Sequence, residues 1–258
     1  MKHLFDLTGK VAVVTGGSKG IGKAICQAYA AHGAKVIVAS RKLDACQEVV
    51  DQIRADGGEA TALSCNITHR ADLEKLVAES RETYGQIDIL VANAAVNPFM
   101  GSNLDIPDDA FEKIMTCNVQ SNLWLAQMVV PEMKERGDGA FIIVSSIGGL
   151  KGSAALGAYA ISKSADMQLV RNLASEFSRH NIRFNCIAPG LVKTDFAKAL
   201  WNDPKRAAAR VGGTPLARLG EPEDIAGIAV YLAAPAGSWT TGQTFVIDGG
   251  VMANATAG

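Results

Sequence analysis

The sequence lacks the marks of several protein classes. It has no apolar run approaching the roughly 20 residues that a membrane-spanning helix needs. The opening residues, Met1 to Asp6, lack the apolar core of a signal peptide. With 25 basic and 26 acidic residues the formal net charge is −1, so no basic surface for nucleic acid or for a membrane is indicated. We expect a cytoplasmic protein without nucleic-acid or membrane partners.

Cysteine and histidine are few and scattered. The five cysteines are Cys26, Cys46, Cys65, Cys117 and Cys186. They form no Cys-x-x-Cys pair, and an odd, dispersed set fits reduced thiols in a core better than a disulfide framework. The four histidines are far apart and show no metal-ligand spacing. We therefore expect buried free thiols and no metal site.

Strand-like and helix-like segments alternate along nearly the whole chain. Of its 258 residues, 48% are hydrophobic and 20% are charged, which suits a soluble globular protein with a large core. Apolar runs predict strands at 11–14, 35–39, 60–63, 87–91, 141–146, 182–187 and 244–247. Near-continuous apolar strands alternating with helices indicate an α/β fold whose parallel sheet is covered on both faces.

The predicted helices fill the intervals between these strands. After the second strand, Leu43, Cys46, Val50 and Ile53 recur at helical spacing and should share a buried face. A long helix is predicted at 107–136, and another that carries Tyr159 should end near 180. Pro222 should open a helix with acidic residues in its first turn. The small, polar tail 253–258 is expected to fray.

A glycine-rich turn follows the first predicted strand and opens the first predicted helix. It reads Thr15-Gly16-Gly17-Ser18-Lys19-Gly20-Ile21-Gly22. Glycines permit a tight turn and a close approach of the backbone to a pyrophosphate, and the helix N-terminus supplies oriented N–H groups. A glycine cluster alone is weak evidence, but its place between strand and helix predicts a dinucleotide site.

The end of the second predicted strand indicates which dinucleotide is bound. An acidic residue there would bind both ribose hydroxyls of NAD and repel a 2′-phosphate. The residues present are Ala39, Ser40 and Arg41, without a carboxylate. Arg41 can form a fork of hydrogen bonds with a phosphate, Ser40 can donate to it, and Lys19 projects from the glycine loop toward the same region. These residues predict NADP(H) over NAD(H).

Tyr159 and Lys163 lie four residues apart in a predicted helix and should share one face. A phenol titrates near ~10 and is a poor proton donor or acceptor at neutral pH. A fixed cation beside a phenol favours the phenolate and lowers its pKa toward the range useful for acid–base catalysis. Ser146 ends the fifth predicted strand, and its hydroxyl could meet the phenol over a substrate oxygen.

Jointly, these motifs make the sequence resemble the short-chain dehydrogenase/reductase family over essentially its whole length. The motifs are Thr15-Gly-x-x-x-Gly20-x-Gly22, Asn93-Ala94-Ala95, Asn118, Ser146, Tyr159-x-x-x-Lys163, Pro189-Gly190 with Thr194, and Asp248-Gly249-Gly250. The stretches Ser40 to Lys42, Asn93 to Phe99 and Arg218 to Asp224 are similar to the branch of NADPH-dependent carbonyl reductases and peroxisomal retinal reductases. The resemblance implies one Rossmann domain over residues 1–258, with a doubly wound seven-stranded parallel sheet in the order 3-2-1-4-5-6-7.

The resemblance also implies a role for each matched residue. Tyr159 would be the acid/base, and Lys163 would lower its pKa and hold the nicotinamide ribose hydroxyls. Ser146 would hydrogen-bond the substrate carbonyl. Asn118 would perturb the long helix and hold a water that links Lys163 to solvent. The other cofactor contacts would come from Gly16, Ser18, Lys19, Gly20, Ile21, Gly22, Ser40, Arg41, Asn66, Ile67, Asn93, Ala94, Ala95, Pro189, Gly190, Val192 and Thr194.

Three positions depart from the family pattern. The residue beside the adenine is usually aspartate and here is Asn66, whose amide oxygen can still accept from the adenine amino group; Ile67 would flank the ring as well. Ala95 stands where the family often has glycine, although the carbonyl-reductase branch tolerates alanine. The sequence ends without the Ser-Lys-Leu peroxisomal address, so no organelle is carried over.

Substrate and assembly are less constrained by the sequence. Mostly apolar residues are expected to border the substrate: Val96, Phe99, Met100, Leu150, Leu156, Leu191, Phe196, Leu200 and Trp201. They favour hydrophobic or aromatic ketones and aldehydes. The segment 190–213 is expected to act as a mobile lid. Similar enzymes are tetramers, paired through the helices near 107–136 and 154–180 and through the last strand, and a homotetramer is expected.

Two other functions remain open at this point. A 3-oxoacyl-thioester reductase acting on acyl-carrier-protein substrates would share every catalytic residue. A redox-silent dinucleotide-binding regulator would typically have lost Tyr159, Lys163 or Ser146, and all three are present. The expected reaction is the reversible reduction of a ketone or aldehyde by NADPH, with Tyr159 as the proton donor.

Overall fold

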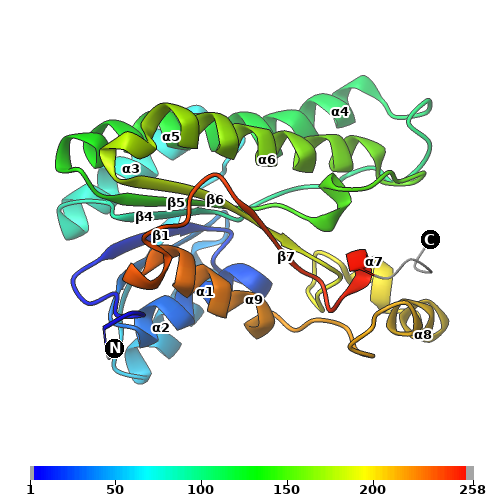
Figure 1. Ribbon diagram of the computed structural model, residues 1–258, viewed down its shortest axis with the longest axis horizontal. Helices are drawn as coiled ribbons and strands as arrows, with labels where there is room; N and C mark the ends of the chain where they lie inside the picture. The colour runs from blue at the N-terminus through cyan, green and yellow to red at the C-terminus, as the bar shows by residue number, and fades with distance from the viewer. Residues whose placement is uncertain (1–2, 254–258) are drawn as a thin grey trace.

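The computed structural model describes residues 3–253 and has three layers, a central sheet between two layers of helices (Figure 1). Seven parallel strands form the sheet in the order β3-β2-β1-β4-β5-β6-β7, as the sequence predicts. The strands are β1 (Val11–Thr15), β2 (Lys35–Ser40), β3 (Glu59–Ser64), β4 (Ile89–Ala92), β5 (Gly139–Val144), β6 (Ile182–Pro189) and β7 (Thr244–Ile247).

The helices divide between the two faces of the sheet. In Figure 1, α1, α2 and α9 cover one face, and α3, α4, α5 and α6 cover the other. The helices are α1 (Gly20–Ala31), α2 (Leu43–Ala55), α3 (Arg70–Tyr84), α4 (Asp108–Met115), α5 (Ser121–Arg136), α6 (Gly157–Phe177), α7 (Lys198–Trp201), α8 (Pro204–Gly212) and α9 (Glu223–Ala233). The short helices α7 and α8 lie together at one end of the molecule, within the predicted lid.

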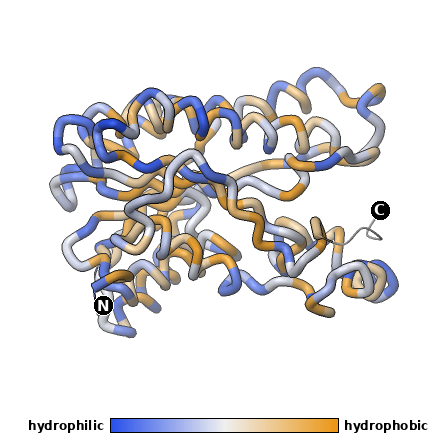
Figure 2. The backbone as a smooth tube through the Cα atoms, viewed as in Figure 1, coloured by the Kyte–Doolittle hydropathy of each residue, from blue (hydrophilic) through white to orange (hydrophobic). Residues whose placement is uncertain are grey.

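Alternate residues of each strand enter different cores, because successive side chains point to opposite faces of a sheet. Along β1, Ala12 and Val14 pack in the core beneath α1, α2 and α9, whereas Val13 packs in the core beneath α3, α5 and α6. All are fully buried. Figure 2 shows the hydrophobic colouring concentrated along the central strands. This two-sided burial explains why the strands read as continuous apolar runs.

Strand order reverses beside β1, whose neighbours are β2 on one side and β4 on the other. In an open parallel sheet, ligands bind at the carboxyl ends of the strands at such a switch point. The glycine-rich turn follows β1, and Asn93 follows β4. The sheet thus brings the predicted cofactor residues to one edge.

Some details differ from the sequence-based expectations, and one of them confirms another expectation. Leu43 was expected in a buried face of α2 but is 49% exposed, because it lies in the first turn, beyond the edge of the core that Cys46, Val50 and Ile53 enter. The fifth strand ends at Val144, two residues before Ser146. The predicted helix 107–136 is interrupted by a π-helical turn, Thr116–Gln120, which contains Asn118. That interruption confirms the perturbation implied for Asn118.

Other expectations are confirmed. All five cysteines are buried free thiols, and burial raises the pKa of Cys65 to about 12. Pro222 precedes α9, whose first turn carries Glu223 and Asp224. Between residues 3 and 253, no helix is both long and apolar enough to span a bilayer. Most of the tail 253–258, expected to fray, lies outside the described residues.

Candidate active site

The glycine-rich turn forms a cradle that has no room for side chains. Gly16 and Gly20 adopt positive φ angles of 66° and 50°. A Cβ added to Gly22 would lie 2.2 Å from the carbonyl oxygen of Gly16, and one on Gly20 would lie 2.9 Å from Cγ2 of Thr194. The first turn of α1 carries no acidic residue and no side-chain cap. Its N–H groups and positive dipole end therefore remain available to an anion, and the cradle fits a dinucleotide pyrophosphate.

Asn93 joins the ends of β1 and β4 beneath this cradle. Its Nδ2 donates to the carbonyl oxygens of Thr15 at 3.0 Å and Gly16 at 3.2 Å. The backbone N–H groups of Asn93 and Ala94 donate to Oγ1 of Thr15 at 3.1 and 3.2 Å. These bonds fix the loop at the switch point, so the sequence-predicted Asn-Ala-Ala segment lies directly against the glycine turn.

The predicted 2′-phosphate residues lie at the rim of the cleft. Ser40 is the last residue of β2, and its Oγ lies 3.0 Å from Sγ of Cys46. Arg41 follows it and is exposed. At the end of β3, Oδ1 of Asn66 accepts hydrogen bonds from the N–H and hydroxyl of Thr68. Asn66 therefore shapes the turn into α3 with the same oxygen that was expected to meet the adenine.

Lys19, expected to reach toward the region of Arg41, forms an exposed ion pair with Asp195. Its Nζ is 2.9 Å from Oδ2 of Asp195, and the two side chains are 66% and 69% exposed. The hydrogen bond and attraction of Asp195 raise the pKa of Lys19, and the same contact lowers the pKa of Asp195. The sequence reasoning missed this partner because Asp195 is remote along the chain.

Ser146 and Tyr159 both lie close to Gly148. Ser146 caps the 3-10 turn that follows β5, and its Oγ accepts a 3.0 Å hydrogen bond from the N–H of Gly148. A Cβ on Gly148 would lie 3.3 Å from Oγ of Ser146 and 3.8 Å from Cε1 of Tyr159. Because Oγ accepts this bond from the backbone, its own hydrogen can donate to a further acceptor.

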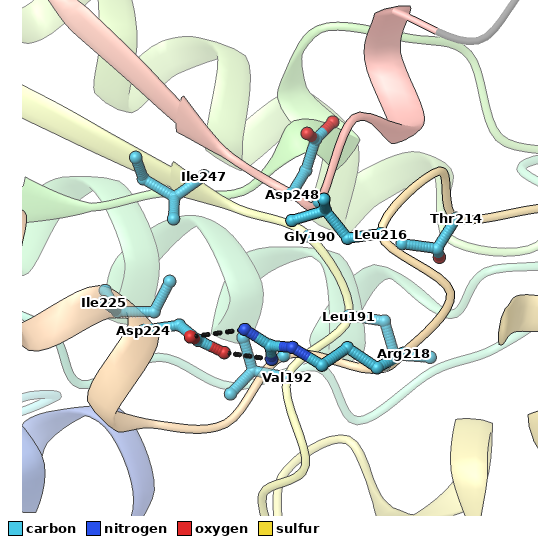
Figure 3. Close-up of a pocket in the computed structure, with 12 residues that line it drawn as sticks. Gly190, Leu191, Val192, Thr214, Leu216, Arg218, Asp224, Ile225, Ile247 and Asp248 are labelled. Carbon is cyan, nitrogen blue, oxygen red and sulfur yellow. Dashed lines mark hydrogen bonds and ion pairs between the residues drawn. The ribbon is translucent and has the colours of Figure 1, made fainter.

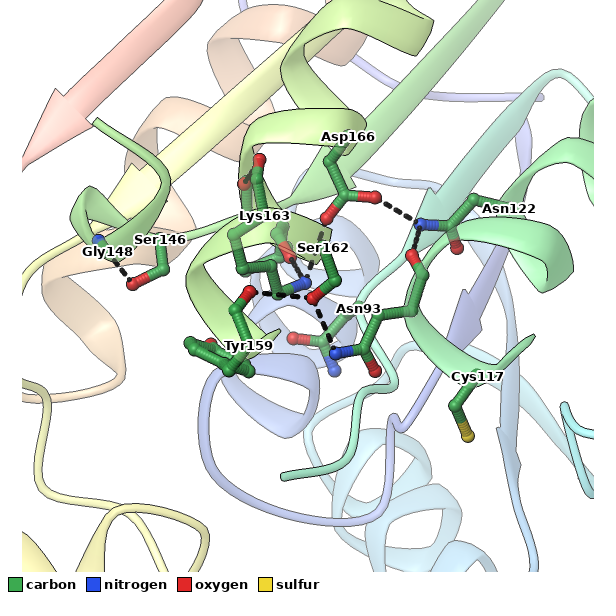
Figure 4. A network of polar contacts seen from close by, with 12 residues as sticks. Asn93, Cys117, Asn122, Ser146, Gly148, Tyr159, Ser162, Lys163 and Asp166 are labelled. Atoms are coloured by element: carbon green, nitrogen blue, oxygen red, sulfur yellow. Dashed lines mark hydrogen bonds and ion pairs between the residues drawn. The ribbon is translucent and has the colours of Figure 1, made fainter. Parts of the chain in front are cut away.

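Lys163 is buried one helical turn beyond Tyr159, with 2% of its side chain exposed (Figure 4). Its Nζ donates to the carbonyl oxygen of Val144 and to Oδ2 of Asp166, both at 3.0 Å. It also lies 5.8 Å from the centroid of the Tyr159 ring. The structure thus brings the predicted cation to the predicted phenol, at the inner end of the cleft.

Asn118 links the loop after β4 to α6, the helix that carries Tyr159 and Lys163. Its Oδ1 accepts from the N–H of Val96 at 2.9 Å, and its Nδ2 donates to the carbonyl oxygen of Val96 and to Oγ of Ser162, both at 3.0 Å. Ser162 in turn donates to the carbonyl oxygen of Tyr159 at 2.7 Å. The π-helical turn is therefore held rigidly to α6, while the water-holding role of Asn118 stays a prediction.

Asp166 and Asn122 belong to this site and were missed by the sequence reasoning. Oδ1 of Asp166 accepts a 2.9 Å hydrogen bond from Nδ2 of Asn122, which also donates to the carbonyl oxygen of Asn118 at 2.6 Å. Both side chains are buried. One signal was present in the sequence: an aspartate three residues after Lys163 shares its helical face, and it interrupts an apolar stripe that continues with Met167 and Val170.

The predicted substrate residues are only partly gathered around Tyr159. Phe196 packs against Tyr159 with ring centroids 6.1 Å apart, and it is 57% exposed. Met100 and Leu150 are also exposed. Nε1 of Trp201 donates to the carbonyl oxygen of Thr194 at 3.1 Å, so the indole stabilises the loop that carries Thr194.

The remaining predicted substrate residues lie nearby or in the surrounding structure. Leu156 pairs with Gly101 through a short β-bridge, and a Cβ on Gly101 would lie 2.8 Å from the Phe99 ring. Val96 packs against the core and Leu200 is half-buried in α7.

A cavity of about 150 Å³ lies beside residues 190–192, and Ser146, Tyr159 and Lys163 are not among the residues that line it (Figure 3). Leu191 and Val192 line it together with Thr214 and Leu216. Arg218 crosses its mouth to pair with Asp224, at 2.5 and 2.7 Å. Leu191, expected to border the substrate, thus lines this cavity. Val192 is only 4% exposed.

Comparison with known proteins agrees with this geometry. A family model described as Enoyl-(Acyl carrier protein) reductase matches residues 16–252. The human protein Dehydrogenase/reductase SDR family member 4 is 42% identical over 244 residues, covering 95% of this chain and 88% of the relative. The 7alpha-hydroxysteroid dehydrogenase of Escherichia coli (strain K12) is 39% identical over 247 residues, covering 95% and 94%. The chain belongs to the short-chain dehydrogenase/reductase family.

Solved structures show the same architecture. The complex of 7α-hydroxysteroid dehydrogenase with NADH and 7-oxo glycochenodeoxycholic acid superimposes with a TM-score of 0.93 at 38% identity, covering 97% of each chain. The gluconate 5-dehydrogenase of Burkholderia cenocepacia, in complex with NADP and tartrate, superimposes with a TM-score of 0.92 at 27% identity, covering 97% of this chain and 98% of that one. The protein is thus an oxidoreductase of this family, with relatives that bind NADH or NADP.

Proposed function

We propose that this protein is an NADP(H)-dependent oxidoreductase that reversibly reduces ketones and aldehydes to alcohols. The observation that carries the proposal is the placement of the Ser146 hydroxyl and the Tyr159 ring beside Gly148, with the buried Lys163 cation near that ring. When bound, the nicotinamide supplies the hydride. The glycine cradle would hold its pyrophosphate, Lys163 and Tyr159 its ribose, and Pro189, Gly190, Val192 and Thr194 its nicotinamide end.

The residues of the chain handle the proton and the charge. As a carbonyl is reduced, negative charge develops on its oxygen, and hydrogen bonds from Ser146 and Tyr159 stabilise that charge. Tyr159 then donates its proton to the oxygen and regains one when the alcohol has left. Lys163 stays positive behind the ring and favours the anionic form of the phenol during this cycle.

The catalytic assignment is tested with Tyr159→Phe. We expect turnover to fall by a factor of about 10² or more, since the proton donor is lost. NADPH should still bind, because the ring and the cradle remain. Turnover is measured as NADPH oxidation and binding by fluorescence titration. Near-normal turnover in the variant would show that another residue is the acid.

The preference for NADP(H) rests on the rim of the cleft. Ser40 ends β2 and the exposed Arg41 follows it, at the place where a carboxylate would select NAD, and no carboxylate occupies the positions 39–41. The relatives do not decide the matter, since one was solved with NADH and another with NADP. We expect Arg41→Asp to move the ratio of NADP to NAD dissociation constants toward NAD by about tenfold or more. Arg70→Asp, on the exposed surface of α3, is the matched charge control; equal affinity of the wild-type protein for both cofactors would refute the preference.

The substrate class is proposed from Phe196, which packs against Tyr159, and from exposed apolar groups on neighbouring loops. Phe196 lies against the catalytic ring, and Met100 and Leu150 also offer apolar surface to solvent. Such a lining favours bulky hydrophobic or aromatic carbonyl compounds. The steroid-acting relative from Escherichia coli is compatible with that choice. Segment 190–213, with α7 and α8, would close over the substrate.

A second candidate is a 3-oxoacyl-thioester reductase. The description of the matching family model, which names an acyl-carrier-protein reductase, favours keeping it. A screen of NADPH oxidation with aryl ketones, aldehydes, diketones and acetoacetyl thioesters separates the two. We expect kcat/KM to be larger for aryl ketones; a clear preference for the thioester would reverse the assignment. A redox-silent regulator would turn over none of them.

We further propose a cytoplasmic homotetramer. Apolar side chains on the outer surfaces of α4, α5, α6 and β7 are exposed in the single chain: Phe111, Leu123, Ile161 and Val246. A second copy of the chain could cover them. Sedimentation equilibrium should give about four times the 27.0 kDa chain mass, and Leu123→Lys should lower it. A monomeric wild-type protein would refute this assembly.

A further inference from the structure

The ammonium of Lys163 is already engaged inside the protein. It donates to the carbonyl oxygen of Val144 and to Oδ2 of Asp166, both at 3.0 Å. An ammonium has three N–H donors, so these two bonds leave one donor for the cleft. Two fixed acceptors therefore determine where Nζ lies relative to the Tyr159 ring, 5.8 Å away.

The carboxylate of Asp166 is held as firmly as the ammonium. It is fully buried, with one oxygen on Lys163 and the other accepting a 2.9 Å hydrogen bond from Asn122 (Figure 4). Asn122 lies on the neighbouring helix, α5, and is only 3% exposed. The same amide nitrogen also donates to the carbonyl oxygen of Asn118 at 2.6 Å. The carboxylate thus links the π-helical turn and α5 to the catalytic lysine.

The surroundings of this pair are poor in other charges. Burial disfavours the charged form of Lys163, but the attraction of Asp166 and Tyr159 outweighs it and raises the pKa of the lysine. The other titratable groups facing the pair are the thiols of Cys186 on β6 and Cys117 in the π-helical turn. Burial raises the pKa of both thiols, so both are neutral. Asp166 is therefore the negative charge that compensates the buried cation.

A buried ion pair gains little net stability over apolar side chains of the same volume. Apolar side chains could occupy this part of α6, as the buried Met167 and Val170 do nearby. We propose that Asp166, held by Asn122, is a positioning residue that keeps Lys163 fixed and charged beside Tyr159 across the working pH range. This inference rests on the proposed role of Tyr159 and Lys163 in catalysis.

The test measures kcat for Asp166→Asn and Asp166→Leu, relative to wild type, between about pH 6 and about pH 10. Without the carboxylate, burial lowers the pKa of Lys163, because desolvation disfavours its charge. The ammonium is then lost as the pH rises. We expect the ratio of variant to wild-type kcat to approach one at the acidic end. This ratio should fall at the alkaline end, because kcat of the variants should decline at a pH at least about one unit lower than kcat of the wild type.

A merely structural role would give a different profile. Misplacement of Lys163 by poor packing would lower kcat by the same factor at every pH. The matched control is Asp88→Asn, because Asp88 is likewise a buried carboxylate, 2% exposed, and accepts a 2.9 Å bond from the N–H of Val11, at the opposite ends of the strands. The ratio of kcat of Asp88→Asn to kcat of the wild type should not change with pH. A flat ratio for both Asp166 variants as well would overturn the proposal.

A readout in the cofactor-free protein makes the test independent of turnover. Lysine labelled with ¹³C at Cε reports the charge on Nζ, and the Lys163 resonance is assigned by its absence in Lys163→Arg. We expect this resonance to titrate at lower pH in Asp166→Asn than in wild type. An unchanged titration would refute the proposal even if kcat fell. If Tyr159→Phe kept its turnover while the titration shifted, the proposed catalysis would fail but the control of Lys163 by Asp166 would stand.

Discussion

Two lysine–aspartate pairs border the cofactor cleft and occupy opposite environments. Lys163 and Asp166 are 3.0 Å apart, with side chains only 2% and 0% exposed. Lys19 and Asp195 are 2.9 Å apart, with side chains 66% and 69% exposed. The contact is nearly the same, but water screens the second pair and cannot reach the first. The buried pair is therefore suited to fixing a charge for chemistry, whereas the exposed pair is suited to exchanging partners when a ligand arrives.

Removing the buried cation should produce the largest effect. Lys163→Met leaves the carboxylate of Asp166 buried without its partner, which should lower the free energy of unfolding by about 3 kcal/mol. Turnover should be lost as well. Urea unfolding at neutral pH measures the stability, and Lys19→Met, at the exposed pair, is the control that should leave it unchanged. Equal stability of the two variants would contradict the contrast between the pairs.

Removing both buried charges should separate stability from catalysis. Lys163→Met combined with Asp166→Leu leaves no unpaired charge, so most of the lost unfolding free energy should return, to within about 1–2 kcal/mol of wild type. Turnover should stay absent, because no cation lies behind Tyr159. Urea unfolding and NADPH oxidation are measured on the same preparations. A double variant no more stable than Lys163→Met would show that packing, not charge, dominates this position.

A third pair, Arg218 with Asp224, lies beside the cavity that Leu191 and Val192 line. Breaking this pair should have an intermediate, pH-dependent effect on stability. The hydrogen bond from Arg218 lowers the pKa of Asp224 to about 2. A carboxyl whose pKa is lower in the folded state stabilises the fold above its unfolded pKa, and this stabilisation is lost as the pH falls through about 2. Asp224→Asn should therefore lower Tm near about pH 5 and make progressively less difference below about pH 4. A Tm difference that is constant with pH would exclude the ion pair as its cause.

Breaking the exposed pair should have the smallest effect. Asp195→Asn removes the partner of Lys19, and its ammonium would then have no competing carboxylate when the proposed cradle holds a dinucleotide. We expect NADPH affinity to rise by only a few-fold, since exposed ion pairs are weak, and the gain to vanish at high salt. Fluorescence titrations at low and high ionic strength measure both. Asp203→Asn, at the residue that caps α8 in the same segment, 190–213, is the control, and a salt-independent gain would point to a change in the structure of this segment instead.

The sequence was sufficient for features that depend on local pattern. Apolar runs predicted all seven strands, and the glycines of the loop after β1 predicted its tight turn, because these properties follow from side-chain burial and from backbone freedom at the same residues. Tyr159 and Lys163 were found because helical spacing places them on one face. Errors occurred at ends of elements, such as Leu43 in α2 and the end of β5, where local pattern is weakest.

The amino-acid sequence by itself determined the fold class, the cofactor cradle and the identity of the groups proposed for the chemistry, since each follows from periodicity or from a motif within a few residues. Only the tertiary structure decided which group holds Asp166 and which carboxylate pairs with Lys19. Asp166 meets Asn122 from another helix, and Lys19 meets Asp195 from a segment 176 residues away. Such contacts depend on how the two helix layers pack on the sheet and on which atoms water can reach. No local pattern records either property.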